Sequence, residues 1–176
     1  MHRRHGSRRS AVGCLLVAAI ACGFVGCAGY KLGEPGHLPF ASIHVAPPIN
    51  TSLAPQAAPL LGSAVIRALD RSGRVSVALE DDADARLAIT ITTYRREVAA
   101  ERSNDTELAR KWRVTLTAEC TLTNRRDGQA WFSRRAVSAF DEVYVDSGLV
   151  PAEYQNMPVL TAKLAQEISR EVLGAW

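Results

Sequence analysis

The sequence is poor in the residues and motifs that build catalytic and metal-binding sites. Its 176 residues include only four histidines and four cysteines, and two of the histidines lie within the first ten residues. It has no G-x-S-x-G nucleophile motif, no Walker loop, no H-E-x-x-H and no C-x-x-C. We interpret His37 and His44 as ordinary surface or strand residues. The sequence therefore predicts a protein that is not an enzyme and that uses no metal or cofactor.

Internal repeats and low-complexity segments are also missing, so the chain is not expected to be a repeat protein. Its length of 176 residues suits one domain. The most acidic segment, EDDADAR at residues 80–86, lacks the spaced oxygen ligands and the distal glutamate of a calcium loop. We expect it to form an acidic turn between two strands.

The first ten residues contain four arginines and no acidic residue, and an apolar run follows at residues 11–26. Sixteen residues fall short of the roughly 20 that span a bilayer, which disfavours the alternative of a transmembrane anchor. A basic start, an apolar run and small residues at its end predict a secretory signal over residues 1–26. Its removal changes the formal charge from +3 to near −1, because 17 basic residues then face 18 acidic ones. Nucleic-acid binding is therefore not expected.

Cys27 is the predicted site of a covalent lipid. The preceding Phe24-Val25-Gly26 resembles the bacterial lipobox, after which signal cleavage leaves the cysteine acylated at the new N-terminus. A competing lipobox ends at Cys22 and is weaker, because an alanine occupies its leading position. The residue after Cys27 is Ala28 and not the aspartate that tends to retain lipoproteins at the inner membrane, which indicates the outer membrane. We expect a lipidated tether over residues 27–39 and one domain over residues 40–176.

Hydrophobic periodicity predicts the elements of that domain. Alternation predicts strands at 40–46, 74–80, 85–97 and 111–124, and a poorer alternation favours another at 130–140. The first strand is expected to bury Ala41, Ile43 and Val45, and the second to bury Val75, Val77 and Leu79. The strand at 111–124 has the clearest pattern, and the residues expected to face inward along it are Trp112, Val114, Leu116, Ala118, Cys120 and Leu122.

Two helices are expected, at residues 59–72 and 156–176. Gly73 is a suitable C-terminal cap for the first, and Pro158 lies near the predicted start of the second. Asp127-Gly128 indicates a hairpin, and the structure of residues 138–156 is left open. This order predicts an α+β two-layer sandwich, with both helices on one face of a four- to five-stranded mixed, mostly antiparallel sheet. The other face carries threonine and arginine and is either solvated or an interface.

Several stretches together resemble the LPS-assembly lipoprotein family, LptE. They are CAGYKLG at residues 27–33, IHVAPPINTSLAP at 43–55, LLGSAVIRALDRSGRVSV at 60–77, ADARLAITITTYRREV at 83–98 and DGQAWF at 127–132. Ala28 is a departure, because the family more often has glycine directly after the cysteine. The resemblance implies an outer-membrane lipoprotein that plugs the β-barrel protein LptD and assists delivery of lipopolysaccharide to the outer leaflet.

Under this resemblance, arginine and lysine at strand ends and in the hairpin are candidates to bind the phosphates of lipid A. The candidates are Arg95, Arg96, Arg113, Lys111, Arg125 and Arg126. The alternative is a family of a different class, the lipoprotein activators of penicillin-binding proteins or the curli-secretion lipoproteins, which begin with a similar order of elements. Such an activator usually has a long linker after the lipidated cysteine, whereas here the domain begins about a dozen residues after Cys27.

Overall fold

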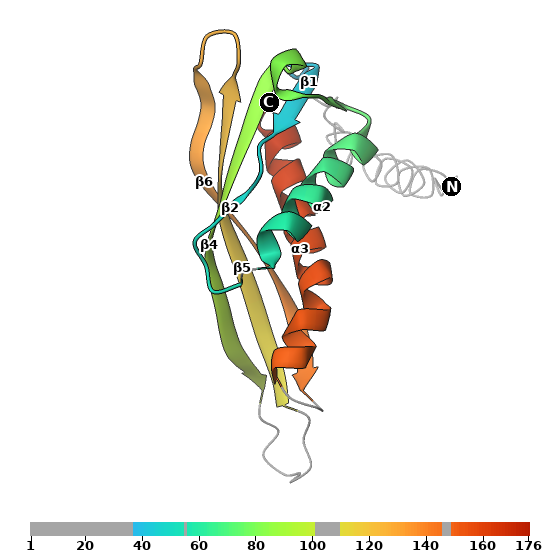
Figure 1. Ribbon diagram of the computed structural model, residues 1–176, viewed down its shortest axis with the longest axis vertical. Coiled ribbons are helices and arrows are strands. Elements are labelled where there is room, and N and C mark those ends of the chain that lie inside the picture. Colours follow the sequence, from blue (N-terminus) through green and yellow to red (C-terminus); the bar gives the residue numbers. More distant parts are fainter. Residues whose placement is uncertain (1–36, 55, 101–109, 146–148) are drawn as a thin grey trace, which may run out of the picture. The chain divides into compact units, whose positions relative to one another are not determined.

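Two helices lie on one face of a mixed sheet in the residues that the computed structural model describes, which are 37–54, 56–100, 110–145 and 149–176 (Figure 1). Five strands follow the order β3-β1-β4-β5-β6, and β2 lies beside β4. The predicted α+β two-layer arrangement is confirmed. The elements are β1 Ser42–Val45, β2 Ile49–Asn50, α2 Ala57–Ser72, β3 Ser76–Val77, a 3-10 turn η2 Glu80–Asp82, β4 Ala85–Ala100, β5 Arg110–Asn124, β6 Ala130–Val145 and α3 Leu149–Gly174.

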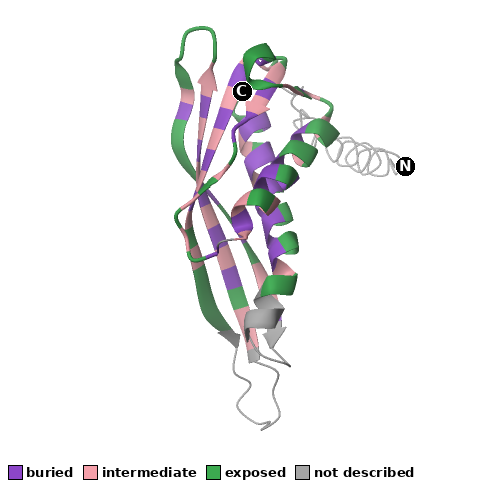
Figure 2. Ribbon diagram, in the orientation of Figure 1, coloured by how far each residue is buried: buried purple, intermediate pink, exposed green. Residues whose placement is uncertain are grey.

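The long strands β4, β5 and β6 pair antiparallel and make up most of the sheet, whereas β1, β2 and β3 are short and join in parallel. Buried and partly exposed residues alternate along β4 and β5 (Figure 2). The predicted inward set of β5 is confirmed, with Trp112 half-buried at the end of the row. Alternation predicted these strands because a sheet with one covered face selects apolar side chains at every second residue.

Helix α2 buries its apolar face against the sheet and α3. Leu61, Val65 and Leu69 are fully buried, as their three- and four-residue spacing predicts. Each such side chain contributes about 1.5–3 kcal/mol relative to full exposure. Gly73 follows the helix with a φ of 64°, the left-handed conformation of a helix C-cap, and its N–H bonds the carbonyl of Asp70. The predicted cap is confirmed.

Two of the expected inward residues face solvent. Ala41 is exposed and precedes β1, and Leu79 is 76% exposed. The strand predicted at 74–80 is only Ser76–Val77, because its partner β1 is short and the chain turns into η2 directly afterwards. The prediction that Leu79 joins Val75 and Val77 is therefore wrong, while the acidic turn expected between two strands is confirmed.

Helix α3 begins earlier than predicted, so Pro158 lies inside it and not near its start. Proline has no N–H for the bond to the carbonyl four residues earlier, which here is that of Tyr154. Both residues are exposed, so water can satisfy that carbonyl. Residues 138–156, left open by the sequence, are divided between the end of β6 and the first turns of α3, with 146–148 outside the described residues.

Strand β6 contains a bulge that explains its poor alternation. Arg134 has a φ of 49°, and two residues, Ser133 and Arg134, lie opposite the single residue Thr121. Phe132 and Val137 are buried on either side of the bulge, at a spacing of five residues instead of an even number. A period-two pattern therefore breaks at this point although the strand continues.

Cys120 lies among the buried core residues and is a free thiol. Burial, with a further contribution from the negative charge of Glu171, raises the pKa of the Cys120 thiol to about 12. It acts as a small apolar side chain, as its place in the strand pattern predicts.

Candidate functional site

The sheet has one face that neither helix covers, and we call it the open face. Directly paired residues of antiparallel strands share a face, so the cross-strand register defines its members. They are Arg86, Ala88, Thr90, Thr93, Arg95 and Glu97 of β4, the odd-numbered residues from Lys111 to Thr123 of β5, and Ala136, Ser138, Phe140 and Glu142 of β6. Threonines form its middle, and charged residues lie toward its ends.

A cluster of charges occupies the end of the open face nearest Lys111. Glu97, Arg113 and Glu142 lie side by side across the three strands. Glu142 accepts a hydrogen bond from Arg113 at 3.4 Å and pairs with Lys111 at 2.5 Å. Arg95 contacts Glu97 at 3.6 Å. We call these five residues the Arg113 cluster.

Two features of the Arg113 cluster determine its charge and its surroundings, namely the ionised state of Glu142 and the contact of Arg113 with an aromatic ring. The hydrogen bond from Lys111, the charge of Lys111 and the contacts of Arg113 together lower the pKa of the Glu142 carboxyl, against a smaller opposing effect of desolvation. Glu142 is therefore ionised at neutral pH. The guanidinium of Arg113 also lies 4.8 Å from the ring centre of Phe140, in the geometry of a cation–π contact. Phe140 is 54% exposed, so an apolar surface adjoins the charges.

The six predicted lipid-binding residues do not converge on one place. Arg95, Lys111 and Arg113 belong to the Arg113 cluster, whereas Arg96 lies on the opposite face and stacks on Tyr94 at 5.5 Å. Arg125 and Arg126 lie in the turn between β5 and β6. A strand rises about 3.3 Å per residue, so the turn is about 45 Å from Lys111.

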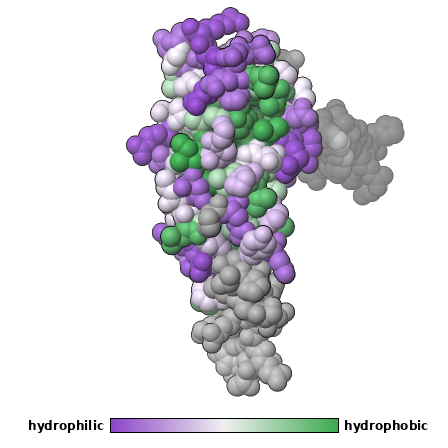
Figure 3. All heavy atoms as spheres, viewed as in Figure 1, coloured by the Kyte–Doolittle hydropathy of each residue, from purple (hydrophilic) through white to green (hydrophobic). Residues whose placement is uncertain are grey.

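The charges of that turn are paired with acidic residues of η2 and the start of β4. Arg125 contacts Glu80 at 3.1 Å, and Arg126 contacts Asp84 at 3.2 Å. Hydrophilic side chains gather over this hairpin (Figure 3). No single phosphate group reaches both the hairpin and the Arg113 cluster, so these are two separate candidate sites.

Sequence reasoning did not identify Glu97, Phe140 and Glu142 as neighbours of the candidate arginines. Glu97 and Arg113 are brought together by pairing across a bulge in β4, and the bulge at Arg134 hides the alternation that places Phe140 and Glu142 outward. The one signal for this arrangement in the sequence was that acidic and basic residues lie at similar distances from the strand ends that pair with one another.

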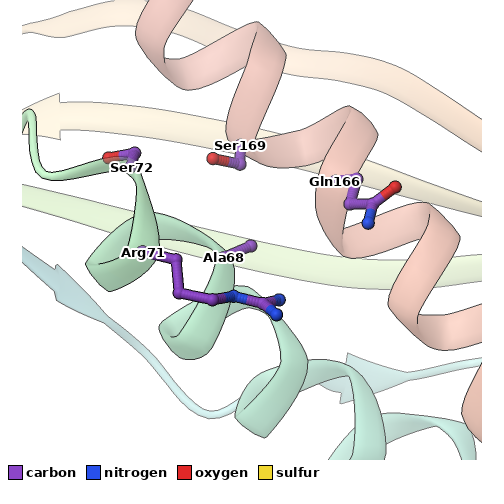
Figure 4. A pocket seen from close by; sticks show the side chains of 5 residues that line it. All are labelled: Ala68, Arg71, Ser72, Gln166 and Ser169. Atoms are coloured by element: carbon purple, nitrogen blue, oxygen red, sulfur yellow. The ribbon is translucent and has the colours of Figure 1, made fainter.

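A shallow hollow of about 260 Å³ lies between α2 and α3, lined by Ala68, Arg71, Ser72, Gln166 and Ser169 (Figure 4). Arg71 donates to the carbonyl of Arg67, and Ser72 donates to that of Leu69. His37 and His44 are the histidines of the described residues, and neither lines the hollow, so within this part of the chain its serines have no imidazole base beside them.

Across the described ranges, no helix is long and apolar enough to cross a bilayer. The same residues contain no group of three or more histidine, cysteine, aspartate or glutamate side chains placed to hold a metal. Cys27, the predicted signal over residues 1–26 and the predicted tether up to residue 36 lie outside the described residues.

A family model of lipopolysaccharide assembly, LptE, matches residues 40–173. The chain belongs to the LptE family. The match spans nearly all of the predicted domain, and the LptE family is one of non-catalytic assembly lipoproteins. The resemblance found in the sequence motifs is thus confirmed at the level of the family. Comparison with curated proteins gives no match.

Solved structures share the fold of this LptE-family chain. A minor lipoprotein from Acinetobacter baumannii has a TM-score of 0.53 at 16% identity, covering 78% of this chain and 95% of its own. Protein XCC0632 from Xanthomonas campestris has a TM-score of 0.55 at 16% identity, with coverages of 81% and 89%. The hypothetical protein CT253 from Chlamydia trachomatis has a TM-score of 0.52 at 10% identity, with coverages of 77% and 97%. At these identities the similarity establishes the fold alone.

Proposed function

We propose that this chain is an outer-membrane lipoprotein that docks its open face inside the LptD β-barrel and assists delivery of lipopolysaccharide to the outer leaflet. The observation that supports this most is the open face itself, a polar surface across three long strands that neither α2 nor α3 covers (Figure 1). The lumen of a transmembrane barrel is polar, because lipid-facing and lumen-facing residues alternate along each strand. A threonine-rich sheet face is complementary to such a lumen.

The anchor is proposed at Cys27, with acyl chains added after removal of residues 1–26. Phe40, the first residue of the family match, lies thirteen positions after Cys27. An extended chain spans at most about 3.3–3.6 Å per residue, so the tether reaches about 45 Å. This reach holds the domain close to the membrane that carries the barrel, on its periplasmic side.

Lipid phosphates are proposed to bind at the Arg113 cluster. Arg95, Lys111 and Arg113 lie on the docking face, and the exposed ring of Phe140 adjoins them. Phosphate oxygens accept strong charge-assisted hydrogen bonds from such cations. We rank Arg96, Arg125 and Arg126 below them, because Arg96 lies on the other face and the hairpin arginines lie in the turn between β5 and β6, outside the open face.

The alternative, an activator of a penicillin-binding protein or a curli-type secretion lipoprotein, is disfavoured by the short tether. An activator of a cell-wall synthase has to cross the periplasm, and about 45 Å of chain leaves little reach beyond the domain. The shared fold of several lipoproteins does not separate these functions, because fold alone does not determine function.

Co-purification tests the proposed function. The full-length protein is extracted from its own outer membrane in mild detergent, and the co-purifying proteins are identified by mass spectrometry. A stoichiometric large β-barrel supports the proposal, and a cell-wall synthase without a barrel contradicts it.

Membrane fractionation tests the proposed anchor. Cys27→Ser should release the protein from the membrane fraction, whereas Cys22→Ser, the matched control, should leave it membrane-bound.

A further inference from the structure

Glu142 occupies the position in the Arg113 cluster where an anionic ligand would bind. Its two carboxylate oxygens point to different cations, Oε2 to Lys111 and Oε1 to Arg113. Lys111 and Arg113 lie two residues apart on one face of β5, and Glu142 lies directly opposite Arg113 on β6. One carboxylate thus bridges two cations from a neighbouring strand, as a phosphate with two free oxygens would.

We infer that Glu142 is an in-chain competitor that keeps this basic pair occupied until a phosphate-bearing amphiphile displaces it. This inference rests on the proposed function and concerns how the same site selects its ligand. A ligand with a single negative charge gains no charge advantage over the carboxylate it replaces. A phosphate monoester, with a charge near −2 at neutral pH, or two neighbouring phosphates, does gain one. Glu142 therefore sets the minimum negative charge that a ligand needs in order to displace it.

The surroundings favour a lipid over free phosphate as the displacing ligand. Arg113 is held over the ring of Phe140, so its guanidinium stays in place when Glu142 moves away. The exposed half of that ring offers apolar contact to the part of an amphiphile next to its phosphate. Glu142 and Lys111 each keep about a third of their side-chain surface exposed, so exchange requires no unfolding.

Glu142→Gln tests the inference, because it removes the competing charge and keeps nearly the same shape. The matched control is Glu119→Gln. Glu119 lies on the same open face, pairs with Arg134 at 2.9 Å, and is about 20 Å along β5 from Arg113. The probe is fluorescent phosphatidic acid in uncharged detergent micelles, which is titrated with the full-length protein and followed by anisotropy.

The wild-type protein is expected to bind phosphatidic acid and not phosphatidylglycerol, which carries a single charge. Glu142→Gln should bind phosphatidic acid about fivefold more tightly and should gain binding to phosphatidylglycerol. Glu119→Gln should match the wild-type protein. Equal affinities of Glu142→Gln and wild type, or an equal gain in both variants, overturn the inference.

A double variant separates this inference from the proposed lipid site. Lys111→Gln/Arg113→Gln should lose most binding of phosphatidic acid, with folding checked by its thermal transition. If that loss occurs but Glu142→Gln changes nothing, the lipid site stands and the competitor role of Glu142 fails. If the double variant binds like wild type, the Arg113 cluster is not the lipid site and both fail. Competition by inorganic phosphate as strong as that by the lipid overturns the preference for an amphiphile.

Discussion

Asp84 joins three segments of the chain through one carboxylate. Its Oδ2 accepts hydrogen bonds from the N–H groups of Ala41 and Ser42 at 3.2 Å and from the Ser42 hydroxyl at 3.0 Å. Its Oδ1 accepts one from Arg126 in the hairpin at 3.2 Å. The Ala-Asp-Ala entry into β4, which is part of the resemblance to the LptE family, thus has a structural purpose. It ties the start of β1 to the start of β4.

Asp84→Asn should make stability less dependent on pH. The backbone N–H of Ala41, the hydroxyl and N–H of Ser42 and the charge of Arg126 lower the pKa of Asp84 in the folded state, despite some desolvation. A lowered folded-state pKa adds stability above the unfolded pKa of about 3.9, and this stability is lost as pH falls through the folded value.

We expect Asp84→Asn to lower the free energy of unfolding by about 1 kcal/mol at pH 7, since the carboxylate is partly exposed. Urea unfolding from neutral to acidic pH is the measurement. The difference between variant and wild type should shrink below about pH 4. A difference that stays constant with pH would contradict this account.

At the scale of elements, the glycine that caps α2 can be compared with the glycine that ends α3. Gly73 has a φ of 64°, whereas Gly174, at the end of α3, has no positive φ, and a Cβ added at either position would meet no atom within 4 Å. Gly73→Ala should therefore lower the free energy of unfolding by about 1 kcal/mol through backbone strain alone. Gly174→Ala should change it little. Thermal unfolding of both variants checks this, and equal losses would show that conformation is not the cause.

The elements also show where sequence patterns suffice and where they fail. Periodicity identified α2, β4 and β5, because each presents one continuous apolar face to the core. It failed at Leu79, where a short partner strand ends the pairing. It also failed at Pro158, because proline is favoured in the first turn of a helix and here lies inside α3. The bulge at Arg134 interrupts alternation in β6.

The candidate site was predictable only in part for the same reason. Lys111 and Arg113 on β5 follow clear alternation, so their face could be read directly. On β4 the irregularity between Ile91 and Thr93 reverses the alternation, so Arg95 shares the open face with Arg86 and Arg96 does not. Which carboxylates face them depends on the register between strands. A bulge shifts that register by one residue, and no local pattern reveals the shift. Glu142 and Phe140 lie beyond the bulge of β6, and their place beside Arg113 therefore required the structure.

At the scale of the whole molecule, three aromatic side chains, which we call the aromatic group, join the beginning of the domain to the last helix. They are Phe40, Trp131 and Trp176. Phe40 lies 5.1 Å from Trp131 and 6.0 Å from Trp176, and the two tryptophans are 5.6 Å apart between ring centres. Phe40 directly follows the predicted tether, so this group fixes the point at which the domain meets its proposed anchor.

Phe40→Ala should therefore lower the free energy of unfolding by about 3 kcal/mol, because Phe40 is 5% exposed and its loss leaves a cavity. The matched control is Phe140→Ala, which removes the same side chain from a site that is 54% exposed. It should cost well under half as much. Denaturant unfolding measures both, and equal losses would show that the aromatic group does not stabilise the domain.

The open face is the surface whose role depends on a partner, so a change there should separate stability from assembly. Thr117 lies at its centre, between Thr93 and Ser138, and Thr117→Arg adds a bulky charge without disturbing the core. We expect its thermal transition to stay close to that of wild type while recovery of the barrel in co-purification falls at least tenfold. Ser63→Arg, on the exposed side of α2, is the control and should leave both unchanged. Full barrel recovery with Thr117→Arg would mean that the open face is solvated in the assembled protein, and the docking surface would have to lie on the helices.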